Sequence, residues 1–249
     1  MTTSQKTGSS SFKDARFTTT HWSVVLGAGS PKSPHQKEAL ETLCRTYWYP
    51  LYAYLRRGGH NTDEAEERTQ AFFAHILEKE FLGKVEPKPA KFRSFLLIVL
   101  RHFLIDEFHR GAAAKRGGRK KPLPLDFEEG ERKYALEPTH DFSPEKVFER
   151  SWALTLLDKT LNRLETELAN LNKQHLFDVL RNHLCGDASE VSYKDVASGL
   201  GMTEAAVKVT VYRLRKRYRE ILRDEISQTV DSSDQIDEEM RALRAALSA

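Results

Sequence analysis

The stretch 192–225, SYKDVASGLGMTEAAVKVTVYRLRKRYREILRDE, has the most regular spacing in the chain. Its first part predicts a short helix ending at Gly201, because glycine tolerates the left-handed conformation common just after a helix. Thr203 is then a suitable N-cap for a second helix, and Glu204 suits the positive end of its dipole. We therefore expect two helices joined by a tight glycine turn.

The second of these helices, over about 204–225, has two contrasting faces. On a 3.6-residue period, one stripe is apolar and consists of Val207, Val211, Leu214, Tyr218, Ile221 and Leu222. The other face is basic and mixed, with Ala205, Lys208, Val209, Tyr212, Arg213, Arg215, Lys216 and Arg219. This pattern is typical of a helix-turn-helix whose second helix enters the DNA major groove. The alternative is an ordinary helical hairpin with a solvated basic face.

The composition of the chain is that of a soluble protein, and it does not by itself identify a function. The 249 residues are 39% hydrophobic and 30% charged, with a net charge of only +3. Charge is distributed unevenly: residues 101–121 hold seven Lys or Arg against two acids, and residues 122–145 hold seven acids against two bases. A nucleic-acid partner therefore cannot be argued from the total charge, and the distribution of charge along the chain matters more.

Targeting and metal-binding signals are weak. The longest unbroken apolar run, 95–100, is six residues, so we expect neither a signal peptide nor a membrane span. The two cysteines lie far apart, as is usual in a reducing cytoplasm. His175, His183 and Cys185 are interpreted as ordinary helix residues and not as metal ligands. No cofactor is expected.

The N-terminal half predicts helices with aromatic inner faces. Residues 47–55 are interpreted as core, with Pro50 near a helix start. Asn61 or Thr62 is expected to cap the next helix, 63–77. Its expected inner face is Ala65, Thr69, Phe72, Phe73, Ile76 and Leu77, and Asp63, Glu64, Glu66, Glu67 and Gln70 are left for solvent or a partner.

Residues 92–110 predict the most apolar helix of the chain. Six of its side chains are expected to be largely buried, namely Phe92, Phe95, Leu96, Val99, Phe103 and Phe108. The helix leads into the basic run ending at Lys121. Aromatic residues followed by Lys and Arg residues suit a site for single-stranded nucleic acid. A core helix followed by a solvated linker would have the same composition.

We predict an all-α protein of two small helical domains. The expected divisions are an N-terminal extension (1–34), a first domain (35–116), an acidic flexible linker (117–142), a second domain (143–226) and a C-terminal tail (227–249). Ser143 and Pro144 predict the start of the second domain's first helix. The tail has a short amphipathic pattern, from Ile236 to Leu247, and either a frayed helix or a docking element would produce it.

In this order, three segments resemble motifs of bacterial RNA polymerase sigma factors of the extracytoplasmic-function type. Residues 65–73, AEERTQAFF, are similar to A-E-D-L-x-Q-x-x-F. Residues 92–110 are similar to F-R-x-W-L…A-R-N-x-x-I-D…R, and residues 207–222 to V-K-S-R-L-x-R-A-R-x-x-L. Together the three segments span most of the chain.

The resemblance implies roles for particular residues. Core polymerase would be contacted through its β′ clamp helices and β flap, with Asp63, Glu66, Glu67, Gln70 and Phe73 on this chain. The −10 promoter element would be bound and melted by Arg93, Arg101, His102, Asp106, His109 and Arg110. The −35 element would be read by Thr203, Ala205, Lys208, Val209, Tyr212, Arg213, Arg215, Lys216 and Arg219. The resemblance also implies a cytoplasmic protein and allows an anti-sigma partner.

Three other functions compete with promoter recognition. A stand-alone helix-turn-helix regulator would share the second domain, but it has no need of the acidic docking helix. An interaction module that only mimics a sigma factor also stays open. A nucleic-acid enzyme is disfavoured, because the sequence contains no paired carboxylates, phosphate loop or Ser/His/Asp set at usable spacing.

Overall fold

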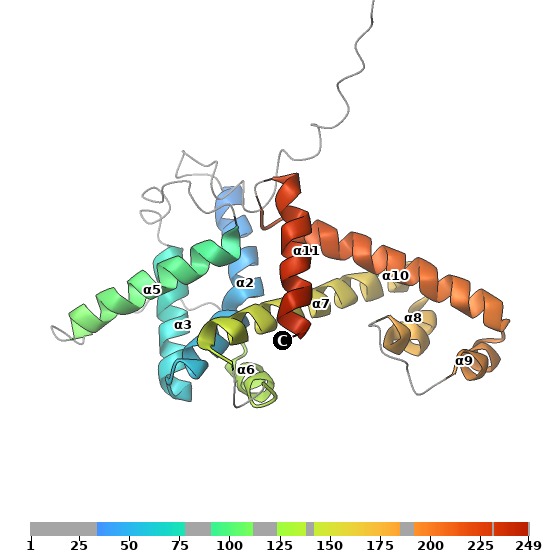
Figure 1. Ribbon diagram of the computed structural model, residues 1–249, viewed down its shortest axis with the longest axis horizontal. Helices are drawn as coiled ribbons and strands as arrows, with labels where there is room; N and C mark the ends of the chain where they lie inside the picture. Colours follow the sequence, from blue (N-terminus) through green and yellow to red (C-terminus); the bar gives the residue numbers. More distant parts are fainter. Residues whose placement is uncertain are drawn as a thin grey trace, which may run out of the picture.

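The computed structural model describes residues 34–77, 91–111, 124–137, 142–184, 192–230 and 232–248. Over these residues the protein is helical, and its only strand-like feature is an isolated bridge between Lys91 and Val230. The helices are α2 (Pro34–Arg57), α3 (Thr62–Ile76), α5 (Phe92–Gly111), α6 (Phe127–Tyr134), α7 (Pro144–Asn170), α8 (Gln174–Leu180), η1 (Arg181–His183), α9 (Tyr193–Leu200), α10 (Glu204–Ser227) and α11 (Ser233–Ser248). The all-α prediction is confirmed for this part of the chain (Figure 1).

Helix α2 carries the aromatic stretch into the centre of a first core. Tyr47, Leu51 and Tyr52 are fully buried there. Pro50 lies inside this 24-residue helix, so the prediction of a helix start near Pro50 is wrong. A proline in a helix interior removes one backbone hydrogen bond, and here the burial of its neighbours offsets that cost.

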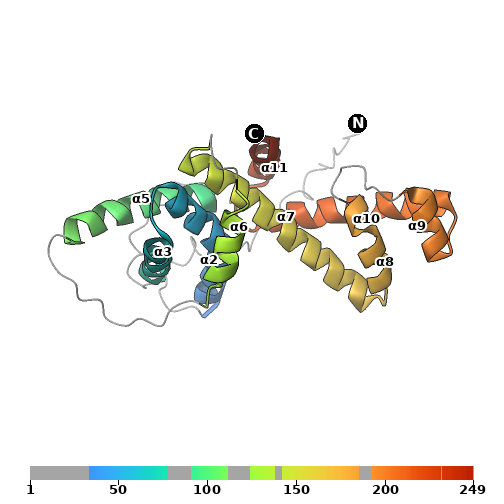
Figure 2. The same ribbon diagram turned by 90° about the horizontal axis from the view of Figure 1, so that it is seen from below.

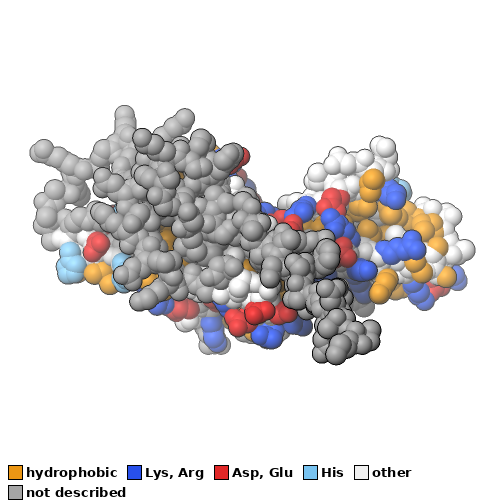
Figure 3. Space-filling view, turned by 90° about the horizontal axis from the view of Figure 1, so that it is seen from above, with side chains coloured by type: hydrophobic (Ala, Val, Ile, Leu, Met, Phe, Trp, Pro, Cys, Tyr) orange, Lys and Arg blue, Asp and Glu red, His pale blue; other side chains and the backbone are white. Residues whose placement is uncertain are grey.

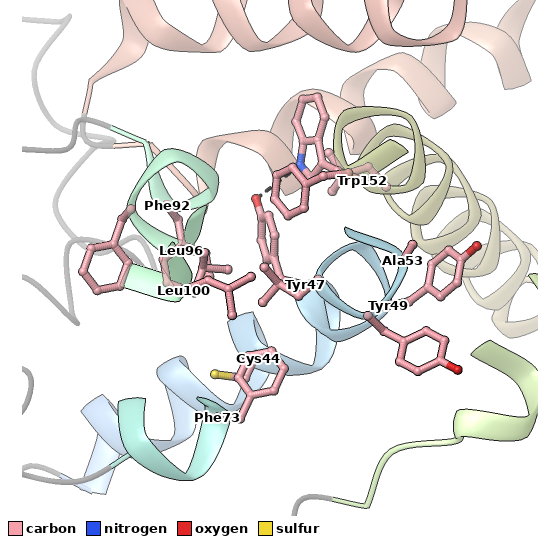
Figure 4. Packing of buried hydrophobic residues seen from close by; sticks show 14 of the residues in the cluster. Cys44, Tyr47, Tyr49, Ala53, Phe73, Phe92, Leu96, Leu100 and Trp152 are labelled. Carbon is pink, nitrogen blue, oxygen red and sulfur yellow. Dashed lines mark hydrogen bonds between the residues drawn. The ribbon is translucent and has the colours of Figure 1, made fainter. Parts of the chain in front are cut away.

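Helices α3 and α5 complete this side of the first core. Of the two residues predicted to cap α3, Asn61 is the N-cap, and it forms a capping box with Glu64. Figure 4 shows Phe73, Leu96 and Leu100 lying around α2, and Trp152 of α7 approaching Tyr47. The Trp152 indole N–H donates to the Tyr47 hydroxyl at 3.2 Å.

Five of the six residues expected to be buried in α5 are buried or half-buried. The exception is Phe108, which is 82% exposed, so its predicted burial is wrong. The reason is positional: the first core covers α5 only as far as Phe103 and Leu104. The helix continues beyond that core, and its last turns extend away from it (Figure 1).

The predicted flexible linker contains a packed helix. Residues 117–123 and 138–141 lie outside the described residues, but α6 forms in between and packs on α2. Phe127 lies edge-on to Trp48 with 5.4 Å between ring centres, and Gly130 lies where a Cβ would come within 2.9 Å of the Trp48 ring. The prediction of a flexible linker over the whole of 117–142 is therefore corrected. The contacts of Phe127 and Gly130 with Trp48 hold its middle part against α2.

Two long helices run through both cores of the molecule. The first half of α7 packs in the first core through Phe148 and Trp152, and its second half packs in a second core through Leu164. Helix α10 contributes in the same way, with Val207 in the second core and Ile226 in the first. The two predicted domains are therefore joined by continuous helices and not by the acidic segment alone (Figure 2).

The C-terminal residues form α11, which docks on the body of the protein. Ile236 and Leu243 are buried in the first core, and Glu239 is only 1% exposed. Of the two alternatives for this tail, the structure has the docking element. Most of the predicted N-terminal extension (1–34) lies outside the described residues.

Candidate nucleic-acid interface

The turn between α9 and α10 has the geometry of a helix-turn-helix. Gly201 adopts the left-handed conformation, with φ 62°, and the amide of Met202 donates to the Ala197 carbonyl at 2.9 Å. The Thr203 hydroxyl then accepts a hydrogen bond from the Ala206 amide at 3.2 Å. These two caps hold α10 at a fixed angle to α9, as the sequence predicts.

Helix α10 turns its two faces in opposite directions. Val207, Val211 and Leu214 are buried in the second core, and Tyr218 is half-buried. All the predicted contact residues on the helix itself are exposed: Ala205, Lys208, Val209, Tyr212, Arg213, Arg215, Lys216 and Arg219. Two of them are exposed apolar or aromatic side chains, Val209 at 49% and Tyr212 at 69%. Figure 3 shows Lys and Arg side chains among hydrophobic ones at this end of the molecule.

The cations of this face are not equally available. Lys208 pairs with Glu204 at 2.6 Å, which raises the pKa of its amine. The Arg215 guanidinium donates to the His183 carbonyl at 2.9 Å and so braces the second core. Arg213, Lys216 and Arg219 have no hydrogen bond or ion pair with any residue that the structure describes. These three can bind an external anion without breaking an internal contact.

The outer end of α5 presents a second exposed surface. His102 and His109 lie on it, together with the apolar Ile98 (49% exposed) and Ile105 (54% exposed). Phe108 stands beside His109, with 5.9 Å between ring centres. Ile105 and Phe108 are not among the predicted contacts, although the i, i+4, i+7 spacing of Ile98, His102 and Ile105 places these three residues on one helix face.

The other predicted −10 residues differ in availability. Arg101 is half-exposed and pairs with Glu145 at 2.8 Å. Asp106 is exposed, and the side chain of Arg110 lies outside the described residues. Arg93 is separated from the rest at the first turn of α5, where its side chain is only 12% exposed and binds Glu239 at 2.6 Å. The structure therefore does not bring Arg93 together with His102 and His109.

The predicted polymerase contacts on α3 are mostly on the surface. Asp63, Glu66 and Glu67 are exposed, and Gln70 is half-buried. Phe73 is fully buried against α2, so its side chain belongs to the core and not to a contact surface. Helical periodicity therefore predicted the position of Phe73 correctly, whereas the sequence resemblance had implied a polymerase contact.

The part of the chain that the structure describes has neither a cluster of metal-binding side chains nor a membrane-spanning helix. Within it, no three His, Cys, Asp or Glu side chains gather as metal ligands would. None of the described helices combines the length and the apolar composition that a membrane span requires. Cys185, one of the three residues considered as ligands, lies outside the described residues.

Comparison with known proteins supports one family. The chain is similar to RNA polymerase sigma factor YlaC of Bacillus subtilis (strain 168), with 24% identity over 181 residues. The alignment covers 72% of this chain and 89% of that relative. No protein-family model matches the sequence, and no solved structure matches it. The similarity to YlaC supports a place for this chain in the sigma factor family.

Proposed function

We propose that this protein is an RNA polymerase sigma factor of the extracytoplasmic-function type, which binds core polymerase and directs it to promoters. The observation that carries the proposal is the outer face of α10. There a helix-turn-helix presents Val209 and Tyr212 beside three cations that have no partner among the described residues, Arg213, Lys216 and Arg219. The similarity to YlaC favours a sigma factor over other proteins with such a face.

The −35 element is assigned to α10. A helix of this kind fits the major groove, where Arg and Lys donate to guanine edges and apolar groups contact thymine methyls. Arg213 and Lys216 are the proposed readers, and Tyr212 and Val209 supply the apolar contacts. Thr203 and Arg215 act differently, since the first caps α10 and the second braces it against His183.

The −10 element is assigned to the outer end of α5. His102, Ile105, Phe108 and His109 form an exposed aromatic and apolar surface there. Exposed rings stack on unpaired bases and so offset the stacking lost on strand separation. Arg101 lies beside them and supplies a charge for the phosphate backbone.

Core polymerase is assigned to the acidic face of α3, at Asp63, Glu66 and Glu67. These side chains extend from a helix whose other face is buried, so a partner can bind them without unfolding the domain. In this function the chain binds polymerase and promoter DNA and catalyses no reaction itself. The competing stand-alone regulator has the same α10 but needs no polymerase contact.

The first experiment mixes the purified chain with bacterial core RNA polymerase and follows co-elution by size exclusion. A stable complex is expected, and Glu67→Lys should weaken it. Asp158→Lys is the matched control, because it makes the same charge change at an exposed position of α7. If the wild-type chain binds −35 duplex but no polymerase, the regulator is the correct function.

A further inference from the structure

Helix α10 begins with a carboxylate, although most of its charged residues are cations. Residues 204–219 contain six Lys or Arg and one acid, Glu204. Glu204 is the first residue of the helix, and its side chain is 49% exposed. DNA phosphates repel an acid at such a place, so it favours binding only where a base donates a hydrogen bond to it. If α10 binds DNA, Glu204 therefore opposes general attraction and can favour only particular bases.

Helix stability gives little reason for this carboxylate and its partner. The N-terminus of α10 is already capped by Thr203, whose hydroxyl accepts from the Ala206 amide at 3.2 Å. An acid in the first turn also interacts with the helix dipole, but that effect is small and does not require Lys208. The ion pair between Glu204 and Lys208 is exposed on both sides, and exposed i, i+4 pairs stabilise a helix only weakly. The pair is thus available for binding.

The Lys208 amine is held from two sides. The Glu204 carboxylate lies 2.6 Å from it, and the centre of the Tyr193 ring lies 5.8 Å from it. Tyr193 is the first residue of α9, and its ring packs against buried His183 with 5.1 Å between ring centres. A hydrogen-bond donor and an acceptor are therefore fixed side by side at the outer end of α10, beside α9 (Figure 1).

This arrangement matches the major-groove edge of one base pair. A C·G pair presents the cytosine N4 amino group, a donor, beside the O6 and N7 acceptors of guanine. Carboxylates accept from cytosine N4, and lysine donates to guanine O6 or N7. An A·T pair also offers a donor and acceptors, but it places the thymine methyl group against the two charges, where they lose water without gaining a hydrogen bond.

We propose that Glu204 is a specificity-determining residue of the −35 site, and that Glu204 and Lys208 together read one C·G pair. The Glu204 carboxylate accepts from N4 of the cytosine, and the Lys208 amine donates to the guanine of the same pair. Residues at the start of a recognition helix are those that reach base edges. The small, exposed Ala205 beside them allows that end of α10 to approach the bases closely. This inference rests on the proposed function, because it requires α10 in the major groove.

The test selects binding sites from duplexes that carry a random segment, with the full chain alone and in complex with core polymerase. Sequencing of the bound duplexes gives the base preference at each position of the site. The wild-type protein should favour C·G at one position by about 5- to 150-fold, the range of a good two-point contact with a base pair. Glu204→Gln should lose most of that preference and keep the preferences at the other positions.

Exchanging the two charges gives a sharper result. Glu204→Lys with Lys208→Glu retains a pair but reverses donor and acceptor, so the preference should change from C·G to G·C at that position alone. Glu220→Gln is the matched control, because it makes the same change at another exposed residue of α10, which pairs with Arg217 at 3.2 Å. This control should leave every preference unchanged. Thermal unfolding checks each variant, and if the exchange fails to fold, Glu204→Gln still decides the matter.

The inference is overturned if no C·G preference is found, if Glu204→Gln retains it, or if the folded exchange variant still prefers C·G. It is also overturned if Glu204→Gln raises the affinity equally for every sequence, because that result reflects only the loss of a negative charge near phosphates. Failure of the proposed function would look different. A chain that selects C·G through Glu204 but forms no complex with core polymerase is a stand-alone regulator, and the base-reading role of Glu204 then stands.

Discussion

Gly201 and Gly199 lie two residues apart at the end of α9, yet their backbones differ. Gly201 has φ 62°, whereas Gly199 is an ordinary helical residue, and an added Cβ meets nothing within 4 Å at either position. The difference between the two sites is therefore conformational and not steric. It provides an internal comparison for the turn that orients the recognition helix.

We expect Gly201→Ala to lower the free energy of unfolding by about 1–2 kcal/mol, the cost of a left-handed non-glycine residue. Gly201→Asn should cost less, because asparagine tolerates that conformation. Gly199→Ala should instead stabilise by about 0.5–1 kcal/mol, since alanine favours the helix. Urea unfolding of the three variants checks this, and equal losses at both glycines would contradict the role of φ.

A second residue-scale prediction concerns the cations of α10. Arg213→Ala and Lys216→Ala should each weaken −35 duplex binding, by about 1–3 kcal/mol where a base contact is lost. Where a phosphate contact is lost, the salt dependence of binding should instead fall by about 0.9 in slope. Arg217→Ala is the control, because Arg217 is on the same helix but binds Glu167 at 2.8 Å. Equal effects at Arg217 would argue against a specific face.

At the scale of the element, α6 depends on one carboxylate as well as on Phe127. Glu131 accepts from the Arg56 guanidinium at 2.7 Å and from the Tyr52 hydroxyl at 2.6 Å. The hydrogen bonds from Arg56 lower the pKa of Glu131 below its ordinary value of 4.5. A carboxyl with a lowered pKa stabilises the folded state fully above the ordinary value, and this contribution is lost as pH falls through the folded-state pKa.

We therefore expect α6 to loosen in acid. The wild-type chain should lose more stability between pH 7 and pH 3 than Glu131→Gln, which has no such charge to lose. Thermal unfolding at both pH values measures the difference. Glu129→Gln is the control, because among the described residues the Glu129 carboxylate pairs only with Arg132 and Lys133 of its own helix, at the surface. An equal acid sensitivity in Glu131→Gln would contradict the assignment.

At the scale of the whole molecule, α7 and α10 pass through both hydrophobic cores. Unfolding one core would leave half of each helix without its packing surface, and isolated helix segments of this length are marginal in water. We expect the described body to unfold in one transition despite its two cores. Calorimetric and van't Hoff enthalpies should then agree, and two separated heat peaks would contradict a shared framework.

Much of the fold was predictable because its signals are local. The Gly201 turn, the Thr203 and Asn61 caps and the apolar stripes of α3 and α10 depend on residues within a few positions of one another. Spacing alone therefore predicts the helix-turn-helix and the exposed face of α10. The acidic surface of α3 follows from the same periodicity.

Only the tertiary structure decided which of these residues are available. Arg93 is a cation at a suitable place in a motif, but Glu239, 146 positions away, occupies it. Phe108 is an aromatic residue in an apolar helix, but the core ends before it reaches that turn. Helix α6 forms because Trp48 and Arg56 lie opposite it. Contacts between distant residues depend on how the helices pack, and local periodicity contains no information about that packing.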